Sequence, residues 1–145
     1  MDEDQWKNFL KGYNLALSKL DDPNCLGAIS ELAGVLDRDG PKGAKAVLQG
    51  IRQRNSFVYV PVIRGAIAQA SGTGLGINTT IRLTDRFFLG ELGMSNLSRD
   101  SLPYAESLAS TILHELVHGL GGGHANDEEH KRMNDRIHTD CFGGH

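Results

Sequence analysis

Several features that define other classes of protein are scarce or missing in this sequence of 145 residues. No uninterrupted apolar run approaches the roughly 20 residues of a membrane-spanning helix, so no membrane partner is expected. Lys and Arg number 15 against 18 Asp and Glu, and no basic block is dense enough to bind nucleic acid. The acidic N-terminus starts a helical pattern at once, unlike a signal peptide. The natural chain can be longer than this stretch, with its targeting signals outside it.

Cysteine is also scarce, with Cys25 and Cys141 as the two representatives, one near each end of the chain. Two thiols so far apart in sequence either form a disulfide in an oxidising compartment or remain two buried thiols. Their spacing alone leaves both outcomes open.

What is present suits one folded domain over residues 1–145. The hydrophobic content of 39% is enough for a packed core, and the length is close to the common domain size. Apolar residues recur with a helical period in three N-terminal segments and again in two C-terminal ones, which predicts helices over 6–20, 29–36, 44–51, 103–120 and 125–141.

Between these helical segments the sequence is typical of strands. Residues 57–63 are rich in β-branched and aromatic side chains, and Pro61 within them indicates an edge strand or a bulge. A glycine-rich stretch, 70–76, is interpreted as a flexible loop, and residues 77–83 alternate as a second strand. The predicted fold class is therefore α+β, with N-terminal helices, a small sheet, a central helix and a C-terminal helix.

The predicted helix from Pro103 carries the most informative motif, His114-Glu115-Leu116-Val117-His118. Two histidines four residues apart lie one turn above each other, so both imidazoles can reach one cation. Neutral imidazole is a good zinc ligand, and zinc lowers the pKa of a bound water to about 7. Glu115 lies beside His114 and off the line of ligands, where a carboxylate can accept the proton of such a water. The pattern predicts zinc as cofactor, His114 and His118 as ligands, and Glu115 as general base.

A catalytic zinc site usually has three protein ligands and a water. His124 is the predicted third ligand, because the glycines at 121–123 let the chain turn back toward the metal. A side chain from the last predicted helix, such as Asp135 or His138, is the alternative.

The stretch from His114 to His124 resembles the signature of the metzincin clan of zinc peptidases. This resemblance implies His114, His118 and His124 as ligands, Glu115 as base and Gly121 as the turn residue. It also implies a methionine turn below the zinc, for which Met133 lies at a plausible distance.

The chain as a whole is similar to the short zincin-like domains at the C-termini of bacterial Rhs-type (YD-repeat) secreted proteins. The matching features are Asp22-Pro23-Asn24-Cys25, the strand from Thr80, the zinc helix from Thr111 and the late Cys141. This resemblance implies a zincin-like fold and a bacterial secreted or exported domain, and it favours a disulfide between Cys25 and Cys141.

We therefore expect a zinc-dependent hydrolase, and more narrowly a monomeric metallopeptidase whose substrate is a protein or peptide. An extended substrate is expected to pair with a sheet edge around Asn78 to Thr84. Tyr104, His130 and His138 are the candidates for stabilising the oxyanion.

Two alternatives to this function stay open. One is a non-enzymatic zinc-stabilised binding module, closed by His130 or His138 as fourth ligand. The other is a zinc amidase that acts on a non-peptide substrate.

Overall fold

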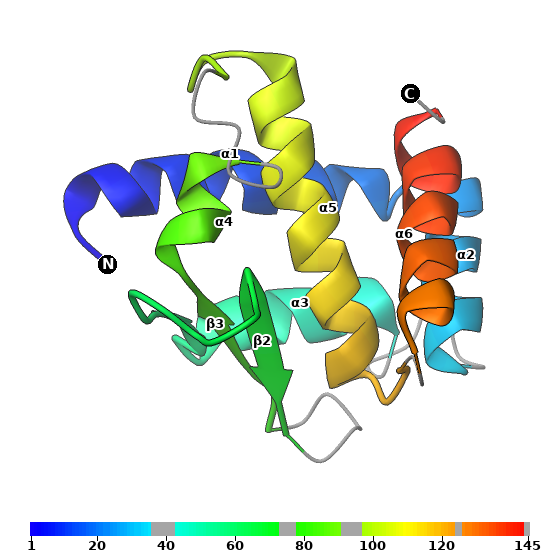
Figure 1. Ribbon diagram of the computed structural model, residues 1–145. Coiled ribbons are helices and arrows are strands. Elements are labelled where there is room, and N and C mark those ends of the chain that lie inside the picture. The colour runs from blue at the N-terminus through cyan, green and yellow to red at the C-terminus, as the bar shows by residue number, and fades with distance from the viewer. Residues whose placement is uncertain (36–42, 73–77, 91–96, 124–125, 144–145) are drawn as a thin grey trace.

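The computed structural model describes residues 1–35, 43–72, 78–90, 97–123 and 126–143. They form a mixed α+β arrangement of helices and a small sheet (Figure 1). The elements in chain order are α1 (Glu3–Lys19), α2 (Pro23–Ala33), α3 (Ala44–Gln53), β1 (Phe57–Tyr59), β2 (Ala68–Ser71), β3 (Thr80–Leu83), α4 (Asp85–Leu89), α5 (Leu102–Gly119) and α6 (Asp127–Phe142).

The helix starts are encoded locally by capping residues. The side chain of Asp2 accepts a hydrogen bond from the N–H of Gln5 at the start of α1, and Asp22 caps α2 in the same way. Pro23 therefore occupies the first turn of α2, so the second helix begins earlier than the predicted 29–36. It ends at Gly34, whose φ of 71° is a left-handed conformation that glycine adopts easily.

The sheet has the order β1-β3-β2 among the described strands. β1 is an edge strand, as Pro61 indicates, but it is shorter than the predicted 57–63. β3 is the middle strand, parallel to β1 and antiparallel to β2. The expectation that a substrate pairs with the segment Asn78 to Thr84 is therefore wrong, because the backbone of β3 is already paired on both sides.

The strand β2 was not expected from the sequence. Its residues, Ala68-Gln69-Ala70-Ser71, overlap the start of the stretch interpreted as a loop, and residues 73–77 of that stretch lie outside the described residues. Small and polar residues carry no strand signature, so only pairing with β3 defines β2.

Helix α5 lies at the centre of the molecule, with the sheet on one side and α6 on the other (Figure 1). α1 crosses behind it closely, because a Cβ built on Gly12 would lie 2.5 Å from the Cβ of Leu108. At its C-terminal end α5 turns at Gly121, where φ is 109°, and Gly122 fits between Val117 and the carbonyl of Leu32. The helix therefore ends immediately before this run of glycines.

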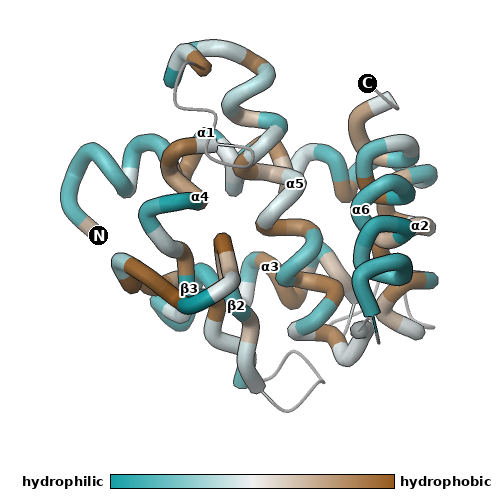
Figure 2. The backbone as a smooth tube through the Cα atoms, in the orientation of Figure 1, coloured by the Kyte–Doolittle hydropathy of each residue, from teal (hydrophilic) through white to brown (hydrophobic). Residues whose placement is uncertain are grey.

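Helix α6 runs antiparallel to α5 and is largely hydrophilic along its exposed face (Figures 1 and 2). Its buried residues are Met133, Ile137, Cys141 and Phe142, so these side chains face the core. Cys25, in the first turn of α2, forms a disulfide with Cys141 in the last turn of α6, with an S–S distance of 2.05 Å. This bond joins the two ends of the sequence and fixes α6 beside α2.

Candidate metal centre

Two of the predicted metal ligands, His114 and His118, lie on α5, which has more buried residues than any other described helix. The Ser101 side chain accepts a hydrogen bond from the N–H of Tyr104, and Pro103 lies in the first turn, which together define where α5 begins. The apolar side of α5 is fully enclosed by the core, through Leu108, Ile112, Leu113, Leu116 and Val117. A helix held this firmly keeps the side chains on its other face in fixed positions.

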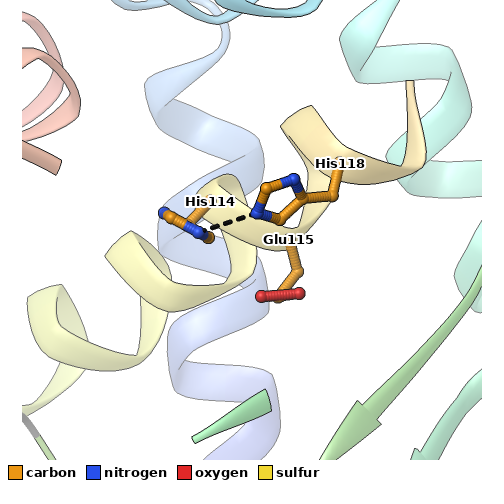
Figure 3. Close-up of side chains that lie close together, drawn as sticks. All are labelled: His114, Glu115 and His118. Carbon is orange, nitrogen blue, oxygen red and sulfur yellow. Dashed lines mark hydrogen bonds between the residues drawn. The ribbon is translucent and has the colours of Figure 1, made fainter. Parts of the chain in front are cut away.

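His114, Glu115 and His118 converge on this other face (Figure 3). One ligand atom from each of the three lies within 4.8 Å of those of the other two. The Nε2 atoms of His114 and His118 are 3.0 Å apart. This group can hold a metal ion, as the spacing in the sequence predicts.

Hydrogen bonds orient both imidazoles toward the same point. Nδ1 of His114 lies 2.8 Å from Oδ1 of Asn134, and Nδ1 of His118 lies 3.0 Å from the carbonyl oxygen of Gly122. Because both partners are oxygen acceptors, each Nδ1 carries the proton and each Nε2 presents a lone pair. Two lone pairs that face each other at 3.0 Å repel unless a cation binds to both. The donor set therefore fits a metal ion.

Asn134 and the carbonyl of Gly122 were not identified from the sequence. The Gly122 contact follows from the turn that ends α5, so the glycine run is a weak signal for it. Asn134 lies on α6 and reaches His114 through helix packing, and no sequence pattern indicates it.

Glu115 lies beside the two histidines but in a drier environment. The residue is 6% exposed, and burial raises the pKa of its carboxyl group to about 7, against an ordinary value of 4.5. A hydrogen bond from the backbone N–H of Ala70 in β2 acts in the opposite direction. A carboxyl group with a pKa close to neutrality is suited to accept and release a proton.

The three residues lie in the wall of a cavity of about 810 Å³. Residues 65–70, which include most of β2, form one side of it, and residues of α6 contribute to the wall as well. Ser107, Ser110 and Thr111 extend the polar face of α5 away from His114, with Arg86 and Glu106 also in the wall. The volume is within the range of sites for small molecules or a few residues of a peptide.

The remaining candidate residues have different environments. His124 lies outside the described residues. Asp135 is exposed and does not line the cavity, whereas His130 and His138 both do. Tyr104 is fully buried, and its hydroxyl donates to the carbonyl of Phe88 at 2.7 Å, so it does not serve as an oxyanion stabiliser.

Met133, the candidate for a methionine turn, lies in the middle of α6 and in the core. It is therefore part of a helix and forms no turn. Comparison of the chain with protein-family models, curated proteins and solved structures finds no match.

Proposed function

We propose that this protein is a zinc-dependent hydrolase, most specifically a metallopeptidase with a zincin-like fold. The observation that carries the proposal is the pair of Nε2 lone pairs of His114 and His118, 3.0 Å apart, beside the buried carboxyl group of Glu115. Two imidazoles and no thiolate favour zinc over softer ions. A purely structural zinc site has no use for a carboxylate in this position.

When bound, zinc would lower the pKa of a coordinated water molecule and polarise a carbonyl oxygen. The protein itself moves the proton. Glu115 accepts it from the attacking water, whose oxygen bonds to the scissile carbonyl carbon, and then delivers it to the amine nitrogen as the C–N bond breaks. The products are a carboxylate and an amine. The position of Glu115 supports this role, because its carboxyl group lies within 4.8 Å of the two histidine ligand atoms.

The free edge of β2 is the better place for an extended substrate. β2 pairs with β3 on one side among the described strands, and its residues line the cavity next to Glu115. An extended peptide laid along this edge gains backbone hydrogen bonds and places a carbonyl group close to the metal centre. The polar wall of Ser107, Ser110 and Thr111 then contacts residues farther along the substrate.

We assign the task of holding the substrate carbonyl oxygen to His138. Its ring forms part of the cavity wall, and its buried Nδ1 makes no hydrogen bond to any described residue. An enclosed Nδ1 is less costly as a bare acceptor than as an unsatisfied N–H, so Nε2 carries the proton and acts as the donor. His138→Ala should lower turnover and leave zinc content unchanged.

The disulfide between Cys25 and Cys141 is compatible with an extracellular or otherwise oxidising environment. We accordingly propose a secreted or exported bacterial domain. Among the described residues, no helix is long and apolar enough to cross a membrane.

The decisive experiment is cleavage of an unbiased peptide library by the zinc-loaded protein, read by mass spectrometry. Glu115→Gln should retain zinc and the fold but lose activity, because an amide does not accept the proton. Wild-type protein stripped of zinc is the control. Activity of Glu115→Gln within a few-fold of wild type removes Glu115 from the role of base.

One alternative is favoured by a specific observation. His130 lies next to His114, with 4.9 Å between the ring centroids, so it would close the site as fourth ligand if another side chain supplies the third. If wild-type protein binds zinc but cleaves no peptide, a zinc-stabilised binding module becomes the better description. Hydrolysis of simple amides without peptide cleavage would indicate the zinc amidase.

A further inference from the structure

We propose that His130, near the N-terminus of α6, is the third imidazole ligand of the metal centre, together with His114 and His118. The inference rests on the proposed function to the extent that a metal ion binds between the two α5 histidines. It differs from the expectation drawn from the sequence, in which His124 completes the site.

The position of His130 relative to His114 is the main observation. Their ring centroids are 4.9 Å apart, nearly the same as the 4.7 Å between His114 and His118. His130 is half-buried and lines the cavity that contains the other two rings. Three imidazoles from two different helices thus line the same cavity, and two of them lie against the ring of His114.

The register of α6 against α5 explains why His130 comes to this place. Asn134 is one turn farther along α6, on the same face, and its Oδ1 accepts the hydrogen bond from Nδ1 of His114. Met133 and Ile137 bury the adjacent side of the helix, and the disulfide at Cys141 holds its far end. Because Asn134 is held against Nδ1 of His114, His130, one turn before it on α6, also lies beside the His114 ring.

His130 must change its side-chain rotamer to join the group. Its ligand atoms are not among those of His114, Glu115 and His118 that lie within 4.8 Å of one another. His130 is a half-buried side chain near the start of α6, and a rotation about χ1 and χ2 does not displace the backbone. The hydrogen bond from its backbone N–H to the carbonyl of Asn126 is unaffected by such a rotation.

A third imidazole also fits the chemistry of the site. Three protein ligands leave one position for water, as a catalytic zinc requires, and a neutral donor of the same softness matches the other two. With His130 in this role, Glu115 remains free to act as the base, and His138, two turns farther along α6, remains available to the substrate.

Zinc affinity is the first measurement, by competition with a chromophoric chelator, for wild type and the variants His114→Ala, His124→Ala, His130→Ala and His138→Ala. His138→Ala is the matched control, because this histidine is on the same helix and lines the same cavity. His130→Ala and His114→Ala should each weaken zinc binding more than 100-fold, whereas the zinc affinity of His138→Ala should remain within a few-fold of wild type. By comparison, removing a residue that only orients a ligand typically lowers metal affinity 10–100-fold. Circular dichroism of the metal-free variants checks that each is folded.

The second measurement identifies the ligands directly, by ¹⁵N nuclear magnetic resonance of the histidine side chains during a zinc titration of wild type. The ring nitrogen of His130 should shift to the metal-bound range together with Nε2 of His114 and Nε2 of His118. An unshifted His130, together with a loss in His130→Ala of less than 100-fold, overturns the inference.

His124 distinguishes the remaining outcomes. If His124→Ala abolishes zinc binding and His130→Ala does not, the ligand expected from the sequence is correct and our inference is wrong. If both variants lose zinc and four imidazoles shift, His130 is a ligand but the site is closed, which contradicts the hydrolase. If wild-type protein binds no zinc, the proposed function itself fails.

Discussion

Oδ1 of Asn134 on α6 lies 2.8 Å from Nδ1 of His114 on α5. This contact connects α5, which carries His114 and His118, with α6, which packs against it. It fixes the tautomer of His114 so that Nε2 faces Nε2 of His118. Asn134 lies one turn from His130 on α6, so the same contact sets how α6 approaches the candidate metal centre.

We expect Asn134→Ala to weaken zinc binding by about 10–100-fold, the usual effect of removing a group that orients a ligand. Asn134→Asp should restore the affinity or increase it, because a carboxylate accepts the same hydrogen bond and raises the basicity of the imidazole. Chelator competition measures both. Equal affinities for wild type and Asn134→Ala would show that the hydrogen bond does not orient His114.

The buried carboxyl group of Glu115 makes the metal-free protein sensitive to pH. Its pKa is about 7 in the folded state, above the ordinary value of 4.5, so folding disfavours the ionised form. The contribution of this group to the stability of the fold is therefore fully present below pH 4.5. It is lost as the pH rises through about 7. A shift of this size corresponds to about 3 kcal/mol.

Glu115→Gln should accordingly match wild type at pH 4.5 and be about 3 kcal/mol more stable at pH 8.5, both measured by urea unfolding in the presence of a chelator. Glu106→Gln is the matched control, since this glutamate lines the same cavity but is half-exposed. A constant difference between Glu115→Gln and wild type at both pH values would contradict the raised pKa.

The disulfide between Cys25 and Cys141 closes a loop with a sequence separation of 116 residues. In the chain-entropy description it stabilises the fold by about 4–5 kcal/mol. Unfolding in urea should therefore occur at a lower midpoint after reduction. The Cys25→Ala, Cys141→Ala double variant should have that lower midpoint with or without reductant. Peptide mapping under non-reducing conditions identifies the bond, and two free thiols in air-exposed protein would disprove it.

The crossing of α1 over α5 depends on Gly12. A Cβ at this position would lie 2.5 Å from Cβ of Leu108, so the helices must separate to accept it. Gly12→Ala should destabilise the protein by about 1–3 kcal/mol, despite the better helix propensity of alanine.

Gly50 in α3 provides the control for this substitution. Among the described residues, a Cβ there would meet only the guanidinium end of Arg54, at 3.0 Å, which can move aside. Gly50→Ala should therefore stabilise the protein by up to about 1 kcal/mol. The two urea midpoints should move in opposite directions, and a shift of the same sign in both would refute the close crossing.

The features that could be predicted from the sequence are those set by near neighbours in the chain. His114 and His118 share a face because a helix brings residues four apart together, and the glycines after them end that helix by their backbone freedom. The inward positions of Met133 and Ile137 in α6 follow from the same period. For these elements the pattern alone was sufficient.

Contacts between distant segments were decided by the tertiary structure. β2 has no β-branched or aromatic residue, and it exists as a strand because β3 pairs with it. The pairing of Cys25 with Cys141 stayed open until α2 and α6 were placed side by side. Asn134 and His130 reach His114 only through the packing of α6 against α5. The spacing of residues within one helix does not predict such a contact. The sequence by itself determined which side chains can bind a metal from α5, whereas the long-range packing of α6 decided which groups surround them.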